Sequence, residues 1–256
     1  MKTAIYIDGY NLYYSRVQGT AYKWLDVAAL FRNKILRVQD PVATVTAFKY
    51  FTAPIKANYA RHGQTSEEAQ TQYLRALAAR EPGLIEIIQG FHIFKPTSLP
   101  LHETGLPPSK ARRQSVWMIE EKLTDVQLAL TNYRDALRGG VDQVVVCSND
   151  SDVEPALQLV RRDAPKVRIG LVMPLPPHAK GQGIVSNKRL TAQAHWVRHH
   201  ILDGELAASQ LPAHVPTKNS LQVSRSTGSH PSKSVRYMRL RRLEATCPVR
   251  AHPRGG

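Results

Sequence analysis

The sequence predicts an α/β fold built on a mainly parallel β-sheet that helices cover on both faces. The chain has 256 residues, of which 42% are hydrophobic, so it is long enough to bury a sizeable core. Its candidate strands are continuous apolar runs, which is typical of strands buried on both faces. These runs alternate along the chain with segments of helical periodicity, and that alternation indicates a parallel α/β fold.

Five apolar segments are expected to form the strands. The first, TAIYI, stops at Asp8, and the fourth, DQVVVC, stops shortly before Asp150. The third, GLIEIIQGFHIF, is long enough for one long strand or a pair of strands. The five segments span residues 3–7, 42–54, 83–94, 142–147 and 166–173.

Five segments are expected to be helical. Asp26 is placed to cap the first of them, and Thr65 with Glu68 has the spacing of a capping box at the second. The third is stopped by two glycines after residue 138, and Val126, Leu130, Tyr133 and Leu137 lie on one of its faces. The five helices are expected at residues 25–36, 64–80, 124–138, 154–162 and 189–202, with Pro-rich loops at 95–115 and 174–187.

The basic charge of the chain is concentrated near its C-terminal end. The formal net charge is +15, and residues 216–256 hold nine Lys or Arg and one Glu. We therefore expect a folded domain over residues 1–205 and a basic, mostly disordered tail over residues 206–256. Such a balance favours anionic partners, with nucleic acid first.

Targeting signals and a disulfide framework are not expected. An apolar run at the N-terminus is broken by Asp8 before it reaches the length of a signal peptide, and no stretch approaches the roughly 18 apolar residues of a membrane span. The two cysteines, Cys147 and Cys247, lie in a predicted core strand and in the polar tail. A reducing cytoplasm is the expected compartment, with no membrane partner.

Acidic side chains follow the first and fourth predicted strands. Asp8, Asp150 and Asp152 are expected to converge, because the carboxyl ends of neighbouring parallel strands meet at one edge of a sheet. Two carboxylates about 4 Å apart repel by on the order of 4 kcal/mol at an effective dielectric constant near 20. A divalent cation, a shared proton or a basic side chain can relieve this repulsion. Oxygen ligands at this density suit Mg²⁺ or Mn²⁺.

Three motifs of the chain resemble, in order, the NYN family of PIN-like nucleases, in its LabA-like branch. The motifs are YIDGYNLYY, EKLTDVQLAL and VVVCSNDSDVEPAL, and the resemblance spans about Thr3 to Ile201. It implies a Rossmann-like three-layer α/β/α domain and a metal site of four acids. Asn149 and Leu123 stand where glycine is usual in the family. On this resemblance the catalytic residues are Asp8, Asp125, Asp150, Asp152 and Asn11, and the four aspartates bind the metal.

These observations predict a metal-dependent nuclease that hydrolyses RNA. The cation would activate a water and stabilise charge on the phosphate, and the basic surroundings would hold the nucleic acid backbone. The sequence is also compatible with a homo-oligomer. The candidate nucleic-acid-binding residues are Lys49, Lys110, Arg112, Arg113, Lys188 and Arg189.

Two alternatives stay open. Relatives in the same subfamily are named 6-hydroxy-3-succinoylpyridine hydroxylase, an activity of nicotine catabolism that would use NADH and oxygen to form 2,5-dihydroxypyridine and succinate semialdehyde. Against it, the first strand ends in IDGYNLYY, which lacks the glycine-rich turn of a dinucleotide site, and an acid there would repel a pyrophosphate. The other alternative is a non-catalytic RNA-binding module, against which the full set of acids argues.

Overall fold

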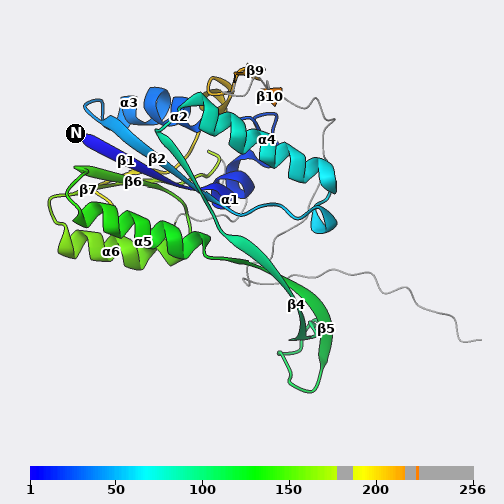
Figure 1. The fold of residues 1–256 in the computed structure, drawn as a ribbon. Helices are drawn as coiled ribbons and strands as arrows, with labels where there is room; N and C mark the ends of the chain where they lie inside the picture. Colours follow the sequence, from blue (N-terminus) through cyan, green and yellow to red (C-terminus); the bar gives the residue numbers. More distant parts are fainter. Residues whose placement is uncertain (178–186, 217–222, 225–256) are drawn as a thin grey trace, which may run out of the picture. The chain divides into compact units, whose positions relative to one another are not determined.

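A six-stranded sheet in the order β3-β2-β1-β6-β7-β8 forms the centre of the fold (Figure 1). The computed structural model describes residues 1–177, 187–216 and 223–224. Every neighbouring pair of strands in this sheet is parallel, which confirms the predicted α/β class. The strands are β1 (Lys2–Asp8), β2 (Thr44–Thr52), β3 (Ile85–Gln89), β6 (Gln143–Cys147), β7 (Arg168–Val172) and β8 (Trp196–Arg198).

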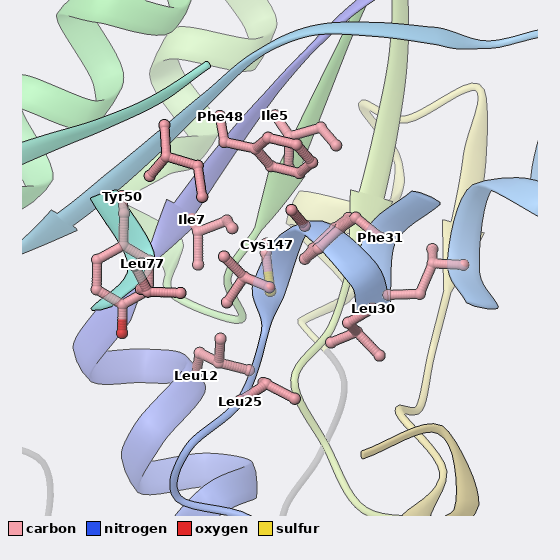
Figure 2. Packing of buried hydrophobic residues seen from close by; sticks show 14 of the residues in the cluster. Ile5, Ile7, Leu12, Leu25, Leu30, Phe31, Phe48, Tyr50, Leu77 and Cys147 are labelled. Carbon is pink, nitrogen blue, oxygen red and sulfur yellow. The ribbon is translucent and has the colours of Figure 1, made fainter. Parts of the chain in front are cut away.

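Helices lie on both faces of the sheet, over two separate hydrophobic clusters. On β1, Ile5 and Ile7 belong to the cluster that α2 and α4 cover, whereas Ala4 and Tyr6 belong to the cluster under α5 and α6. This alternation follows from the period of two residues along a strand. Figure 2 shows the first cluster, with Phe31, Phe48, Leu77 and Cys147 packed around Ile5 and Ile7.

The helices match most of the predicted segments. The larger ones are α2 (Val27–Leu30), which continues as the π-helix η2 (Phe31–Leu36), α4 (Gln64–Arg80), α5 (Thr124–Leu137) and α6 (Glu154–Asp163). The shorter ones are α1 (Gly9–Leu12), η1 (Tyr13–Val17), α3 (Arg37–Gln39), η3 (Ala57–Tyr59), η4 (Ser151–Val153), α7 (Lys188–Thr191) and α8 (Asp203–Ala207).

The predicted helix caps have different outcomes. Asp26 caps α2 as expected, since its side chain accepts a hydrogen bond from the Ala29 amide at 2.9 Å. The expected capping box of Thr65 and Glu68 is wrong. Gly63, with a φ of 53°, occupies the N-cap position of α4, so Thr65 already lies inside the first turn.

The expected helix at 189–202 is also wrong. Only its first residues are helical, in α7, and Trp196–Arg198 form the short edge strand β8. Trp196 explains this outcome. Its ring lies over Gly170, where an added Cβ would be 2.2 Å from Trp196 Cζ2, and its Nε1 donates to the buried Gln143 Oε1 at 2.9 Å. These contacts hold the segment against β7 as a strand.

The expected Pro-rich loop at 95–115 contains strand structure at both ends. β4 (Phe91–Pro100) and β5 (Arg113–Lys122) pair in a two-stranded sheet, and residues 93–120 form a compact unit of their own. Lys95 Nζ lies 2.9 Å from Glu120 Oε1, and Arg113 donates to the Ser98 carbonyl. Cross-strand contacts of this kind stabilise a hairpin that the proline content alone does not predict.

The packed body continues beyond residue 205, where the domain was expected to end. Leu206, Leu211 and Val215 are buried in the cluster around Ile5. A short pair of strands, β9 (His214–Val215) and β10 (Val223–Ser224), follows. The remaining tail positions, 217–222 and 225–256, lie outside the described residues, as does Cys247. Within the described part, no helix has the length and apolarity needed to cross a membrane.

Leu123, just before α5, adopts a left-handed backbone with a φ of 78°. This conformation costs an L-residue about 1–2 kcal/mol, whereas glycine adopts it freely. Its side chain is 46% exposed, so little packing is lost on truncation. We therefore expect Leu123→Gly to raise the free energy of unfolding by about 0.5–1 kcal/mol in urea titrations. Leu123→Ala keeps the strain and is expected to show no gain, so equal stability of the two variants would contradict this explanation.

Candidate functional site at the carboxyl edge of the sheet

The candidate site lies where the strand order reverses, between β1 and β6. The chain runs outward from β1 to β3 in one direction and from β6 to β8 in the other. In open parallel sheets, ligands bind beyond the carboxyl ends of the strands at such a switch point. Asp8 ends β1, and Ser148 follows Cys147, the last residue of β6 and the pairing partner of Ile7. Asp8 and Ser148 are therefore brought side by side.

A chain of hydrogen bonds connects the acids of these two strand ends. Asp8 Oδ1 accepts from the Asn11 amide at 2.9 Å, and Asp8 Oδ2 accepts from Ser148 Oγ at 3.1 Å. Ser148 Oγ in turn accepts from the Asp150 amide at 3.0 Å, and Asp150 Oδ1 accepts from the Asp152 amide at 2.9 Å. Asp8 thus caps α1 and Asp150 caps η4. Capping amides carry partial positive charge and stabilise these carboxylates.

A chain of asparagines runs beside the acids and joins three loops. Asn11 Oδ1 accepts from the Asn149 amide at 2.9 Å, and Asn149 Oδ1 accepts from the Asn187 amide at 3.1 Å. Asn187 caps α7 by accepting from the Arg189 and Leu190 amides. Glycine is usual in the NYN family at the place of Asn149. In this chain the Asn149 side chain fixes the turn by accepting from the Asn187 amide. Sequence reasoning missed Asn187, which lies far along the chain from its partner.

Gly9 is required by close packing rather than by a ligand. A Cβ at this position would lie 2.7 Å from the Phe51 carbonyl oxygen and 2.6 Å from Tyr50 Cε1. The turn after β1 is therefore pressed against β2 and leaves no backbone cradle at this glycine. Burial raises the pKa of Tyr50 and of Cys147, and the negative charge of Asp8 raises both further.

Aromatic side chains stand next to the hydrogen-bonded network. Tyr10 stacks on Tyr14 with ring centroids 5.9 Å apart, and it meets His92 edge-on at 6.0 Å. The Tyr10 hydroxyl donates to the Ala53 carbonyl at 2.6 Å. Burial keeps the pKa of His92 below its ordinary value, partly offset by the Pro54 carbonyl 3.0 Å from Nδ1. The imidazole is therefore neutral at neutral pH.

The remaining predicted acids are placed differently. Asp125 lies half-buried in the first turn of α5, and α5 packs against η4. Asp152 is exposed. Within residues 1–177, 187–216 and 223–224, no three His, Cys, Asp or Glu side chains are arranged to hold a metal ion. The expectation of an Mg²⁺ or Mn²⁺ site of four aspartates is therefore corrected: the oxygens of Asp8 and one oxygen of Asp150 accept hydrogen bonds within the protein instead.

The predicted nucleic-acid-binding residues are divided between the two compact units of the chain. Lys49 forms an ion pair with Asp135 at 2.6 Å on β2, and Arg189 pairs with Glu154 at 3.0 Å. In the hairpin unit, Arg112 pairs with Glu103 at 2.8 Å. The other three residues are exposed: Lys110, Arg113 and Lys188. Binding of RNA by any of them stays a prediction.

Comparisons with known proteins bear on the function. No family model matches the chain. It is 41% identical over 230 residues to 6-hydroxy-3-succinoylpyridine 3-monooxygenase HspA of Pseudomonas putida (strain DSM 28022 / S16), an alignment that covers 84% of this chain and 72% of that protein. The chain belongs to the HspA family. A solved structure of a protein of unknown function from Vibrio parahaemolyticus RIMD 2210633 matches with a TM-score of 0.44 and 18% identity, over 79% of this chain and 93% of that one.

Membership of the HspA family corrects the predicted function. The relative is named as a monooxygenase, so the expectation of a metal-dependent hydrolase that cleaves RNA is wrong. The relative's name also favours an enzyme over a non-catalytic RNA-binding module. The acids at the strand ends misled the sequence reasoning because capping carboxylates and metal-binding carboxylates occupy the same positions in a parallel sheet.

Proposed function

We propose that this chain is a monooxygenase that acts on 6-hydroxy-3-succinoylpyridine. The observation that carries this proposal is the 41% identity to HspA, which extends over most of both chains. The substrate is expected to bind at the carboxyl edge of the sheet, beside Asp8, Asn11 and Asp150. The switch point between β1 and β6 supports this location, because it is where open parallel sheets bind ligands.

The chemistry of the substrate suits the side chains of this edge. Its ring is planar and aromatic, so it can stack against the tyrosines of α1 and η1, Tyr10 and Tyr14. Its ring N–H or hydroxyl is a donor, for which Asp150 and Asn11 offer acceptor oxygens. Its succinoyl carboxylate is expected to point away from Asp8 and Asp150, because like charges close together in a partly buried site repel strongly.

The chain's own residues have separable roles in this proposal. Asp8 holds the Ser148 hydroxyl and the Asn11 amide, and through them it positions the loops that carry Asn149 and Asp150. Tyr10 and Tyr14 orient the ring. His92, which is neutral and 7% exposed, borders the aromatic pair and keeps that side of the site dry.

The redox cofactor that a monooxygenase requires does not fit the turn after β1. NADH would need a backbone cradle for its pyrophosphate, but Gly9 is closed against Phe51 and Tyr50. The N-termini of α1 and η4 already receive the carboxylates of Asp8 and Asp150. A second anionic group at either position would be repelled. The pyrophosphate of NADH is therefore not expected to bind at this turn.

A PIN-like origin of the fold is also part of the proposal. It is supported by the ordered motifs that end β1, begin α5 and follow β6, and by the three-layer arrangement. In this reading the HspA family kept the acidic strand ends of such domains and uses them to set loop geometry.

The activity is tested by incubating the purified full chain with 6-hydroxy-3-succinoylpyridine, NADH and oxygen. We expect substrate-dependent NADH oxidation and release of 2,5-dihydroxypyridine, detected by chromatography. The combined formula of the two products equals that of the substrate plus one water. All four electrons that reduce one O₂ must therefore come from NADH, so two NADH are consumed for each substrate converted. A chain that consumes neither oxygen nor substrate, whether NADH, NADPH or reduced flavin is supplied, would overturn the proposal.

Tyr14→Ala tests the location of the substrate. Loss of one face of the ring stack is expected to raise KM for 6-hydroxy-3-succinoylpyridine about tenfold, since an aromatic pair contributes about 0.5–1.5 kcal/mol beyond its buried area. Val38→Ala, an exposed apolar site on α3, is the matched control and is expected to keep the wild-type KM. An unchanged KM in Tyr14→Ala would place the substrate elsewhere.

A further inference from the structure

The loop that follows β2 carries a lysine at the carboxyl edge of the sheet. β2 pairs with β1 so that Phe51 lies opposite Asp8, and the strand ends at the next residue, Thr52. Lys56 comes shortly after this strand end, and its side chain is exposed. β6 flanks β1 on the other side. The loops that carry Lys56 and Asp150 therefore leave the sheet on opposite sides of Asp8.

Helix α4 fixes the backbone on both sides of Lys56. Gln70 Oε1 accepts from the Ile55 amide at 2.7 Å. Glu67 Oε2 accepts from the Ala57 amide at 3.1 Å. The lysine is therefore presented from a loop that is already ordered, so less conformational entropy is lost when its side chain binds a partner.

The same loop supports the aromatic side of the candidate site. The Ala53 carbonyl accepts from the Tyr10 hydroxyl at 2.6 Å, and the Pro54 carbonyl lies 3.0 Å from His92 Nδ1. Burial is the main cause that lowers the pKa of His92, and the positive charge of Lys56 lowers it further. Lys56 therefore lies within electrostatic range of the imidazole that meets Tyr10 edge-on.

Two other cations of this edge belong to the opposite side of the site. Arg189 is paired with Glu154, with 3.0 Å between Nε and Oε2. Lys188 begins α7 directly after Asn187, whose amide donates to Asn149 in the loop that follows β6. An anion bound near either residue would lie toward the acids of that loop. Lys56 offers a positive charge on the side of the tyrosines instead.

We propose that Lys56 binds the succinoyl carboxylate of the substrate and makes the site selective for it. This inference rests on the proposed function, in which the pyridine ring stacks on Tyr10 and Tyr14. Asp150, on the side of β6, then accepts from the ring hydroxyl or N–H, and Lys56, on the side of β2, meets the acid arm. A substrate with a donor at one end and an anion at the other is thereby oriented by complementary charges.

Steady-state kinetics of the full chain, with NADH and oxygen, test the role of Lys56. Lys56→Met keeps most of the side-chain length but removes the charge. It is expected to raise KM for 6-hydroxy-3-succinoylpyridine about tenfold or more with little change in kcat, as when a charge-assisted hydrogen bond is lost. Lys56→Arg keeps the charge and is expected to recover most of the wild-type KM. Lys166→Met changes an exposed lysine before β7, at the amino edge of the sheet, and is expected to keep the wild-type KM.

An analogue of the substrate with a carboxamide in place of the carboxylate tests the contact itself. The wild type is expected to show a raised KM for this analogue, close to the KM that Lys56→Met shows for the acid. The two proteins are expected to handle the carboxamide alike. A rise in KM that is equally large in Lys56→Met for the acid and for the carboxamide would mean that the substitution disturbs the loop, and it would overturn the proposal.

Direct binding separates failure of this inference from failure of the proposed function. Titration calorimetry of 6-hydroxy-3-succinoylpyridine into the full chain without NADH gives a Kd that does not depend on turnover. A wild type that binds the substrate, together with a Lys56→Met variant of unchanged Kd, would overturn the role of Lys56 and leave the proposed function standing. A wild type that neither binds nor converts the substrate would overturn both.

Discussion

Asp8→Asn is expected to lower kcat/KM for 6-hydroxy-3-succinoylpyridine by about 10- to 100-fold. The side chain is 3% exposed, and each of its oxygens accepts a hydrogen bond, from the Asn11 amide and from Ser148 Oγ. An amide keeps the shape but turns one acceptor into a donor, so the Ser148 hydroxyl loses its acceptor. That loss costs about 1–3 kcal/mol at a buried site. It also releases the Asp150 amide that Ser148 holds, and with it the loop that positions Asp150.

The controls for Asp8→Asn separate positioning from simple unfolding. Ser148→Ala removes the same hydroxyl without adding a donor and is expected to reproduce most of the loss of kcat/KM with a smaller fall in Tm. Asp152→Asn changes an exposed carboxylate of the same loop, whose side chain is not part of the bonds from Asp8 to Asp150. An equal loss of activity in Asp152→Asn would contradict the view that this buried chain of hydrogen bonds sets the geometry of the site.

The parts of the site that lie next to a strand end were predictable from the sequence. Apolar runs that stop at Asp8 and shortly before Asp150 locate two carboxyl ends of a parallel sheet, and their convergence follows from topology. The role of these acids as helix caps could not be predicted from the same pattern. Whether a carboxylate caps a helix or binds a cation depends on which donors surround it, and Ser148 and Asn11 are supplied by different segments. The sequence pattern carries no information about that pairing.

Two other failures have a common physical origin. Residues 189–202 have a helical pattern, but Trp196 packs over Gly170 and places residues 196–198 in an edge strand. Val126 and Leu130 of α5 are exposed although they have the periodicity of an apolar face, and Asp135 of the same helix bonds to Tyr6 and Lys49 of the sheet. In both cases one long-range contact outweighs local periodicity. Propensity and periodicity are summed over a segment, and a single buried tertiary contact can exceed their total.

Asp135→Asn is expected to lower the free energy of unfolding by about 2–4 kcal/mol, since breaking an almost buried ion pair leaves the other charge without compensation. The side chains of Lys49 and Asp135 are 12% and 15% exposed. In the variant, Lys49 retains Glu86, whose oxygen is 3.7 Å away and whose side chain is 61% exposed. Chemical denaturation at neutral pH measures the loss. Asp163→Asn changes an exposed, arginine-paired acid of α6 and is expected to leave the unfolding midpoint unchanged.

The pH dependence of the same variant distinguishes charge from packing. Burial raises the pKa of Asp135, but hydrogen bonds from Lys49, Arg134 and Tyr6 outweigh it and hold the pKa below its ordinary value of 3.8. A carboxyl with a depressed pKa in the folded state stabilises the protein fully above its unfolded pKa and loses that contribution as pH falls through the folded value. The stability gap between wild type and Asp135→Asn is therefore expected to be constant near neutral pH and to close below about pH 4. A gap that persists unchanged at lower pH would mean that the loss comes from packing of the carboxamide. The orientation of α5 against the sheet would then have to be assigned to other contacts of the helix.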